Sequence, residues 1–159
     1  MRPIHFLAAL PLVVTACDPG WNYLAPGGAR LPEPGARFEF AEPPGTRTRI
    51  EAGSFTGTIY ARVDVQNLDD APLTVDPRQM KLLDAQGVAL SGGLSGGTCE
   101  GRHAVVSVLA KGETCGASMR FGGDDYGRLL PQFRTVTLVH DGLSRGAQPL
   151  PLRISLVAD

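Results

Sequence analysis

The side chains with the most distinctive chemistry in this chain are its sulfur and imidazole groups. Three cysteines, three methionines and three histidines are present. Copper prefers such soft sulfur and imidazole ligands, and the sequence offers His103, Met119 and His140, with Cys115 near Met119. These positions lack the short spacing of a histidine–methionine cluster. A copper site would require the fold to bring them together; the alternative places Met119 in the core and both histidines at the surface or at strand ends.

A serine in a glycine-rich stretch offers a second kind of chemistry. Residues 93–97 match the pattern G-x-S-x-G, in which hydrolases expose a nucleophilic serine on a sharp turn between a strand and a helix. No helical pattern follows Ser95, and catalysis also needs a base within reach of the serine oxygen. Because the chain has 20 glycines, a chance match is the better interpretation. We therefore expect no catalytic residue.

Two acidic pairs fall in predicted loops. These are residues 69–70 and residues 124–125. Loop carboxylates can bind calcium, but neither stretch has the spaced oxygen ligands of a calcium loop. Aspartates are also favoured in turns for their local hydrogen bonds. The sequence therefore predicts no metal and no cofactor.

The N-terminal 16 residues have the shape of an export signal. Arg2 supplies a positive charge, an apolar run follows over residues 6–14, and small residues precede Cys17. The run is too short to span a bilayer, which takes about 20 residues. Residues 14–17, Val-Thr-Ala-Cys, resemble the lipobox of bacterial lipoproteins. The resemblance implies cleavage before Cys17, a lipid on that cysteine, and attachment to a membrane facing the periplasm. The alternative is that residues 1–17 form a buried strand or helix.

The residue after the predicted lipid anchor bears on which membrane holds the protein. Asp18 resembles the signal that keeps lipoproteins of enteric bacteria in the inner membrane. We favour the inner over the outer membrane on this basis. Both locations belong to the cell envelope.

The two remaining cysteines, Cys99 and Cys115, are predicted to form a disulfide. With Cys17 lipidated, they are the only other cysteines of the chain, and an exported pair in an oxidising compartment normally forms a bridge. Their spacing is neither Cys-x-x-Cys nor that of a zinc ribbon. A loop of this length would add about 3 kcal/mol of stability.

Residues 17–34 are predicted to be the lipidated cysteine and a flexible tether. Prolines and glycines recur throughout this stretch, and they interrupt regular structure. Trp21 and Tyr23 lie close to the predicted anchor. Two placements remain open for these rings: at the lipid headgroups, where amphipathic rings are favoured, or packed back onto the domain.

The overall charge argues against two classes of partner. The net charge is −1 at pH 7, and no basic run is present. Nucleic acid and a polybasic contact with the membrane are therefore not expected.

Residues 35–159 are predicted to form one domain made of short strands. Apolar and polar residues alternate clearly over residues 56–67, which is the pattern of a half-buried strand. Further short strands are expected at residues 73–75, 80–83, 88–90, 104–109, 114–121, 133–140 and 150–157. Glycine-rich residues 91–101 and residues 122–131 read as loops. About seven or eight short strands without a long helix are typical of an antiparallel β-sandwich.

The order of turns and strands carries a second resemblance. A strand ending at Asn67 is followed by an acidic turn, Pro-Leu-Thr-Val at residues 72–75 and Leu-Leu-Asp-Ala-Gln-Gly at residues 82–87. Leu-Ala-Lys-Gly-Glu-Thr at residues 109–114 then runs into Met-Arg-Phe at residues 119–121. This order resembles the immunoglobulin-like domains of small bacterial lipoproteins. The resemblance implies an all-β, immunoglobulin-like sandwich and supplies no functional residue.

These observations predict a lipid-anchored envelope protein with a non-catalytic binding or structural domain and a protein partner in the envelope. Loops on a rigid sandwich usually carry recognition residues. The candidate binding residues in the predicted loops are Ser91, Gly93, Ser95, Asp124, Asp125 and Tyr126. A periplasmic copper-handling protein is the alternative function, and a serine hydrolase is the less favoured one.

Overall fold

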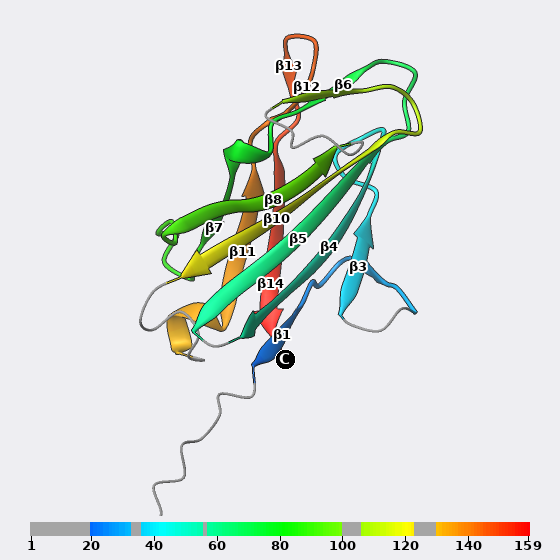
Figure 1. Ribbon diagram of the computed structural model, residues 1–159. Coiled ribbons are helices and arrows are strands. Elements are labelled where there is room, and N and C mark those ends of the chain that lie inside the picture. The colour runs from blue at the N-terminus through cyan, green and yellow to red at the C-terminus, as the bar shows by residue number, and fades with distance from the viewer. Residues whose placement is uncertain (1–19, 33–35, 56, 100–105, 123–129) are drawn as a thin grey trace, which may run out of the picture.

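The computed structural model describes residues 20–32, 36–55, 57–99, 106–122 and 130–159, and these residues form an antiparallel β-sandwich (Figure 1). The predicted all-β, immunoglobulin-like class is confirmed. Within the described ranges the only helices are two short 3-10 turns, and no helix there is long and apolar enough to cross a membrane. The elements are β1 (Trp21–Leu24), β2 (Ala29–Arg30), β3 (Arg37–Phe40), β4 (Thr46–Phe55), β5 (Thr58–Asn67), β6 (Leu73–Val75), η1 (Pro77–Gln79), β7 (Met80–Leu83), β8 (Gly92–Cys99), β9 (Ser107–Leu109), β10 (Thr114–Gly122), η2 (Pro131–Phe133), β11 (Thr135–His140), β12 (Leu143–Arg145), β13 (Gln148–Pro149) and β14 (Leu152–Ala158).

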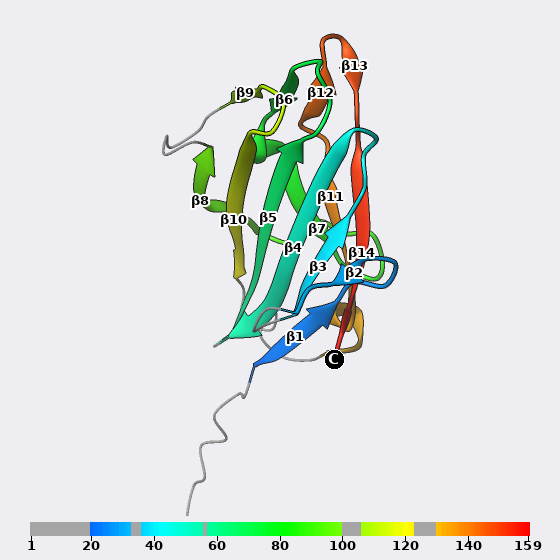
Figure 2. The same cartoon turned by 90° about the vertical axis from the view of Figure 1, so that its right-hand side faces the viewer.

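One continuous sheet folds over to make both layers of the sandwich. Its strand order is β7-β11-β14-β1-β4-β5-β10-β8, with β3 added to β4 and β2 to β3. Figures 1 and 2 show β4, β5, β10 and β8 in one layer, here called the β5 layer, and β7, β11 and β14 in the other, the β14 layer. At the open side, β8 lies against β7 and η1. The arrangement therefore approaches a closed barrel.

Strand β1 joins the two layers. Trp21 and Asn22 pair with β4, whereas Tyr23 and Leu24 pair with β14. Tyr23 is only 1% exposed, and its hydroxyl donates to the carbonyl of Phe133 at 2.7 Å. Residues 20–32 are thus part of the domain, which corrects the prediction that this part of the chain is a flexible tether. The rest of the predicted tether lies outside the described residues.

The alternating residues of β5 form the centre of the core. Ile59, Ala61, Val63 and Val65 are buried on one face, as the alternation predicted. Across the sandwich, they share one hydrophobic cluster with inward residues of β11 and β14, which are Val136, Leu138, Ile154 and Leu156. Burying a side chain of this size contributes about 1.5–3 kcal/mol, so this double row supplies much of the stability of the fold.

A small sheet of order β13-β12-β6-β9 covers one end of the sandwich, where Asn67 is fully buried. The Asn67 amide donates to the carbonyls of Ala71 and Leu109, both at 3.0 Å. Its side-chain oxygen accepts from the backbone N–H of Asp69 at 3.1 Å and from the Arg145 guanidinium at 3.2 Å. Asn67 therefore ties together loops that meet from distant parts of the chain, and we call this the Asn67 end.

Arg145 extends this network. Its guanidinium donates to the carbonyls of Pro44 and Gly45, at 2.8 and 2.9 Å. A Cβ at Gly45 would lie 2.7 Å from the guanidinium, and Gly45 also has a φ of +71°. Only glycine combines that backbone conformation with the space that Arg145 needs.

Candidate functional site

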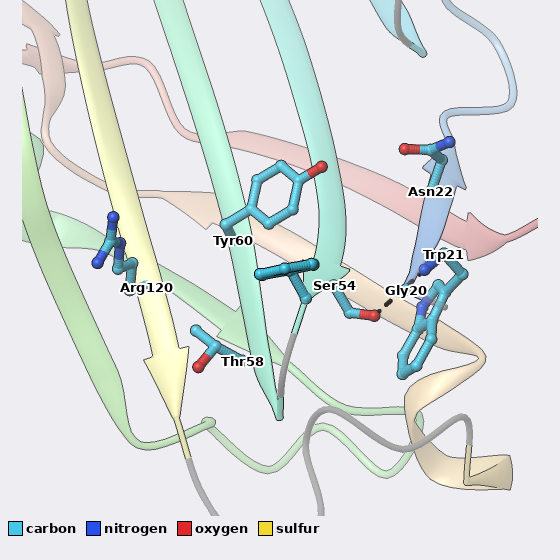
Figure 3. Close-up of a pocket in the computed structure, with 8 residues that line it drawn as sticks. Gly20, Trp21, Asn22, Ser54, Thr58, Tyr60 and Arg120 are labelled. Atoms are coloured by element: carbon cyan, nitrogen blue, oxygen red, sulfur yellow. Dashed lines mark hydrogen bonds between the residues drawn. The ribbon is translucent and has the colours of Figure 1, made fainter. Parts of the chain in front are cut away.

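A pocket lies at the end of the sandwich opposite Asn67, on the outer face of the β5 layer. It has a volume of about 610 Å³, and its lining residues are Gly20, Trp21, Asn22, Ser54, Phe55, Thr58, Tyr60 and Arg120. We call it the Tyr60 pocket. Figure 3 shows Tyr60 in its centre, with Arg120 on one side and Asn22 and Trp21 on the other.

The strand register explains why these side chains meet. Asn22 of β1 pairs with Gly53 of β4, Gly53 pairs with Tyr60 of β5, and Tyr60 pairs with Arg120 of β10. Residues that face each other in a sheet point to the same side. Four strands thus contribute one row of residues across the floor of the pocket.

Gly53 gives the Tyr60 ring its position in that row. A Cβ on Gly53 would lie 2.5 Å from the Tyr60 hydroxyl oxygen and 2.9 Å from the carbonyl oxygen of Trp21. The missing side chain lets the ring lie across β4 toward β1. In Figure 3 the hydroxyl accordingly points toward Asn22.

The rim of the pocket is the tip of the β4–β5 hairpin. Phe55 and Thr58 form the last pair of this ladder, and Gly57 has the positive φ of +76° that suits a tight turn. Phe55 is 64% exposed. A large aromatic side chain thus projects into solvent at the edge of a pocket that already holds two other rings.

Trp21 is held against the domain on the other side of the pocket. Its backbone N–H donates to the hydroxyl of buried Ser54 at 3.4 Å. Its ring makes an edge-to-face contact with Tyr23, the centroids being 6.3 Å apart. Both rings therefore contact the domain: Tyr23 is buried in it, whereas Trp21 stays partly exposed.

The polar groups of the pocket favour an anionic ligand. Arg120 is exposed and makes no ion pair with any described residue, and the described lining residues include no acidic side chain. Burial, with a smaller effect of the charge on Glu51, raises the pKa of Tyr60. Its hydroxyl therefore stays protonated and can donate. Arg120, Tyr60 and Asn22 together offer hydrogen-bond donors beside aromatic surface.

The arginines elsewhere on this outer face are used differently. Arg37 pairs with Glu51 at 2.8 Å and Arg49 with Glu39 at 2.9 Å. These side chains neutralise one another along β3 and β4. The unpaired state of Arg120 is therefore a local property of the Tyr60 pocket and does not extend over the whole layer.

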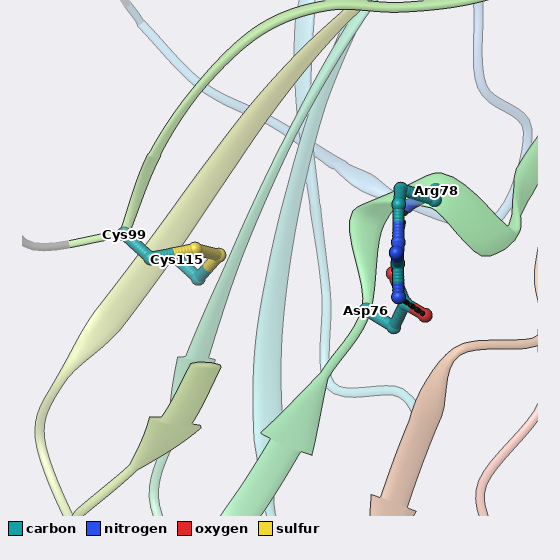
Figure 4. Close-up of a disulfide and its surroundings, with 4 residues drawn as sticks. All are labelled: Asp76, Arg78, Cys99 and Cys115. Carbon is teal, nitrogen blue, oxygen red and sulfur yellow. Dashed lines mark hydrogen bonds and ion pairs between the residues drawn. A yellow bond between two sulfur atoms is a disulfide. The ribbon is translucent and has the colours of Figure 1, made fainter. Parts of the chain in front are cut away.

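The predicted disulfide is present. Cys99 of β8 faces Cys115 of β10 in the sheet register, and the two sulfurs are bonded with their Cα atoms 4.1 Å apart (Figure 4). The bridge fixes β8, whose glycines make it a weak edge strand, to the centre of the β5 layer.

Figure 4 also shows Asp76, whose carboxylate accepts from Arg78 at 2.9 Å and caps η1. This hydrogen bond lowers the pKa of Asp76.

The glycine-rich stretch around Ser95 is a strand, which corrects its prediction as a loop over residues 92–99. Ser95 lies within β8, and its hydroxyl donates to the carbonyl of Ser118 at 3.1 Å. The strand-to-helix turn that a hydrolase nucleophile needs is missing around it. Of the other two candidates in this stretch, Ser91 precedes β8, and Gly93 pairs with Arg120 beside the Tyr60 pocket. Asp124, Asp125 and Tyr126 lie outside the described residues.

The candidate copper ligands are not assembled in the described chain. Met119 is a core residue of β10 and His140 is fully buried at the end of β11, whereas His103 lies outside the described residues. The His140 Nδ1 accepts from the backbone N–H of Gly142 at 3.2 Å. Among the described residues, no group of three or more histidine, cysteine or acidic side chains is placed to hold a metal.

The Tyr60 pocket was not predictable from the sequence, because the row of residues on its floor comes from four separate strands. A weak signal was present in the composition. Only 6% of the residues are aromatic, yet Tyr60 and Phe55 occupy outward or terminal positions of strands, where their rings do not pack in the core.

Comparisons with known proteins give little further guidance. No protein family and no curated protein matches the sequence. Among solved structures, the chain is similar to the crystal structure of the yjhA protein from Bacillus subtilis. The identity is 14%, the TM-score is 0.45, and the match covers 65% of this chain and 77% of that one.

Proposed function

We propose that this protein is a lipid-anchored, non-catalytic protein of the bacterial cell envelope that binds another envelope component through the Tyr60 pocket. The observation that carries the binding role is the pocket itself, where aromatic rings lie beside an arginine that has no ion-pair partner among the described residues. The anchoring role rests on the resemblance of residues 14–17 to a lipobox.

The disulfide supports a location outside the cytoplasm. Bridges such as Cys99–Cys115 persist in oxidising compartments, including the bacterial periplasm, and are rare in the cytosol. A periplasm-facing domain attached through Cys17 is consistent with this bond. The resemblance of Asp18 to the retention signal of enteric lipoproteins favours the inner membrane.

The chemistry of the Tyr60 pocket defines the class of ligand. Arg120 provides a charged fork suited to a carboxylate or phosphate. Tyr60 and Phe55 provide ring surface for an apolar or cationic group next to that anion. The ligand is therefore a group with a negative charge beside an apolar or cationic part, carried by another molecule of the envelope.

Two measurements test this proposal. Mass spectrometry of the N-terminal peptide from membrane-extracted protein should show acylated Cys17, and an unmodified Cys17 contradicts the anchor. Pull-downs of the tagged, full-length protein from native membranes should then recover a protein or lipid component. Arg120→Gln should lose that component, while Arg153→Gln, which changes an exposed arginine of β14, should retain it. Equal recovery with both variants contradicts the role of the pocket.

A further inference from the structure

The Tyr60 pocket lies at the point where the chain approaches its predicted lipid anchor. Gly20 lines the pocket, and Cys17 is three residues earlier in the sequence. Three residues span at most about 11 Å, even when fully extended. A lipid on Cys17 would therefore hold this end of the sandwich at the surface of the bilayer, with the Asn67 end directed away from it.

We propose that the Tyr60 pocket is a membrane-docking surface that binds the phosphate-bearing headgroups of the bilayer to which the protein is anchored. This inference rests on the proposed lipid anchor at Cys17, and it gives the pocket a specific occupant. Phe55 enters the interfacial region, Trp21 and Tyr60 lie at headgroup level, and Arg120 contacts lipid phosphates.

The residue types match the layers of the bilayer interface. Tryptophan and tyrosine rings are favoured at headgroup level because one side of the ring is apolar and the other is polar. The exposed Phe55 side chain at the hairpin tip gains free energy when it leaves water. Arg120 forms charge-assisted hydrogen bonds to phosphate oxygens. The described residues that line the pocket include no acidic side chain, so no carboxylate among them occupies the place of a lipid phosphate.

A second exposed apolar side chain, Val108, shows that the place of the anchor determines which end of the domain can reach the bilayer. Val108 of β9 is as exposed as Phe55, at 64%. It belongs to the small sheet at the Asn67 end, and Figure 2 shows β9 at the opposite end of the sandwich from β1. A connection of three residues cannot bring that end to the bilayer while the Tyr60 end is held there. Val108 therefore serves as the matched control for Phe55.

The single tryptophan of the chain, Trp21, reports directly on this docking. The full-length, acylated protein is reconstituted into vesicles of phosphatidylcholine and phosphatidylglycerol. Trp21 fluorescence is then measured with brominated phosphatidylcholine as the membrane quencher and acrylamide as the neutral aqueous quencher. We expect strong quenching by the brominated lipid and protection from acrylamide, relative to the same protein in detergent.

Four variants make the test specific. Phe55→Ser and Arg120→Gln should each reduce the quenching by brominated lipid and make Trp21 more accessible to acrylamide, while the anchor still keeps this end near the bilayer. Val108→Ser and Arg153→Gln should behave like the wild type. All four change exposed side chains, and unchanged thermal unfolding verifies that each remains folded.

The outcomes separate this inference from the proposed function on which it rests. If Cys17 is acylated but Trp21 stays open to acrylamide in vesicles, docking is overturned and the anchor stands. The same holds if a protein recovered from native membranes protects Trp21 where vesicles do not. If Cys17 is not acylated, both the proposed lipid anchor and the docking that depends on its closeness to Gly20 are contradicted.

Discussion

The two ends of the sandwich use their polar side chains in opposite ways. At the Asn67 end, the Asn67 amide makes four hydrogen bonds and is fully buried. At the other end, Arg120 and the Tyr60 hydroxyl have no hydrogen-bond or ion-pair partner among the described residues. Buried groups with all their bonds made stabilise a single structure. Polar groups that line a pocket and make no such bonds are available for a ligand, so the first end maintains the fold and the second can bind.

The largest expected effect on stability comes from removing Asn67. Asn67→Ala leaves the buried carbonyl of Leu109 and the part-buried carbonyl of Ala71 and N–H of Asp69 without this partner, and each buried orphan costs about 1–3 kcal/mol. We expect a loss on the order of 4 kcal/mol in the free energy of unfolding, measured by urea denaturation. The matched variant at the other end, Asn22→Ala, removes an exposed asparagine and should cost almost nothing. Equal losses would abolish the distinction between the two ends.

The next largest effect is expected from the disulfide, which lies toward the Asn67 end. Cys99 and Cys115 are 16 residues apart in the sequence. Replacing both by serine gives the unfolded chain more conformational freedom and should lower the free energy of unfolding by about 3 kcal/mol. Reductant added to the wild type during urea denaturation should have the same effect, and reductant should not change the double variant. A wild-type midpoint that is insensitive to reductant would contradict the prediction.

A smaller, pH-dependent effect is expected from His140, near the same end. Burial lowers the pKa of His140 to about 4, partly offset by the charges of Asp76 and Asp141. Between that value and the ordinary pKa of about 6.5, the unfolded chain binds the proton and the folded chain does not. Stability therefore falls as the pH falls through this window, by about 2 kcal/mol from pH 7 to pH 5 for this group.

The comparison variant for this effect is His140→Leu. Urea denaturation at pH 7 and pH 5 should give a smaller difference for the variant than for the wild type, because leucine has no proton to bind. If both proteins lose the same stability over this range, other groups carry the pH dependence.

The smallest effect on stability is expected at the Tyr60 pocket. Tyr60→Phe and Arg120→Gln remove groups that bond to no described residue. We therefore expect each variant to change the free energy of unfolding, measured by thermal melting, by no more than about 0.5 kcal/mol. The same variants should weaken binding, since they remove the donors. A loss of more than about 1 kcal/mol would show that these side chains support the fold, and the contrast between the two ends would then fail.

The strand pattern was predictable wherever inward positions were apolar. β5 follows its alternation because Ile59, Val63 and the residues between them face the core in turn. β4 was missed because two of its inward positions are threonines. Thr46 and Thr48 are buried, and their hydroxyls donate to the carbonyls of Pro43 and Glu42, both at 2.7 Å. A threonine whose hydroxyl donates to a backbone carbonyl can occupy a core-facing position. The sequence then lacks the apolar residue that would have indicated the strand.

Strands β1 and β8 were missed for a different reason. Both are surrounded by glycine or proline, which indicate loops when read locally. β1 is stabilised by long-range pairing with β4 and β14, and β8 by pairing with β10 and by the Cys99–Cys115 bridge. The disulfide itself was predictable from cysteine number and export. The Tyr60 pocket was not, because it depends on the register of four strands.

The position of β1 between the two layers also has a consequence for when the protein can fold. Tyr23 and Leu24 pair with residues of β14, and the backbone N–H of Asp159 donates to the carbonyl of Asn22 at 2.9 Å. Pairing between such distant parts of a chain forms slowly. It cannot occur at all until the ribosome has made β14, the final strand. If the chain is exported as proposed, the pairing of β1 with β14 is completed only after the last strand of the domain has crossed the membrane.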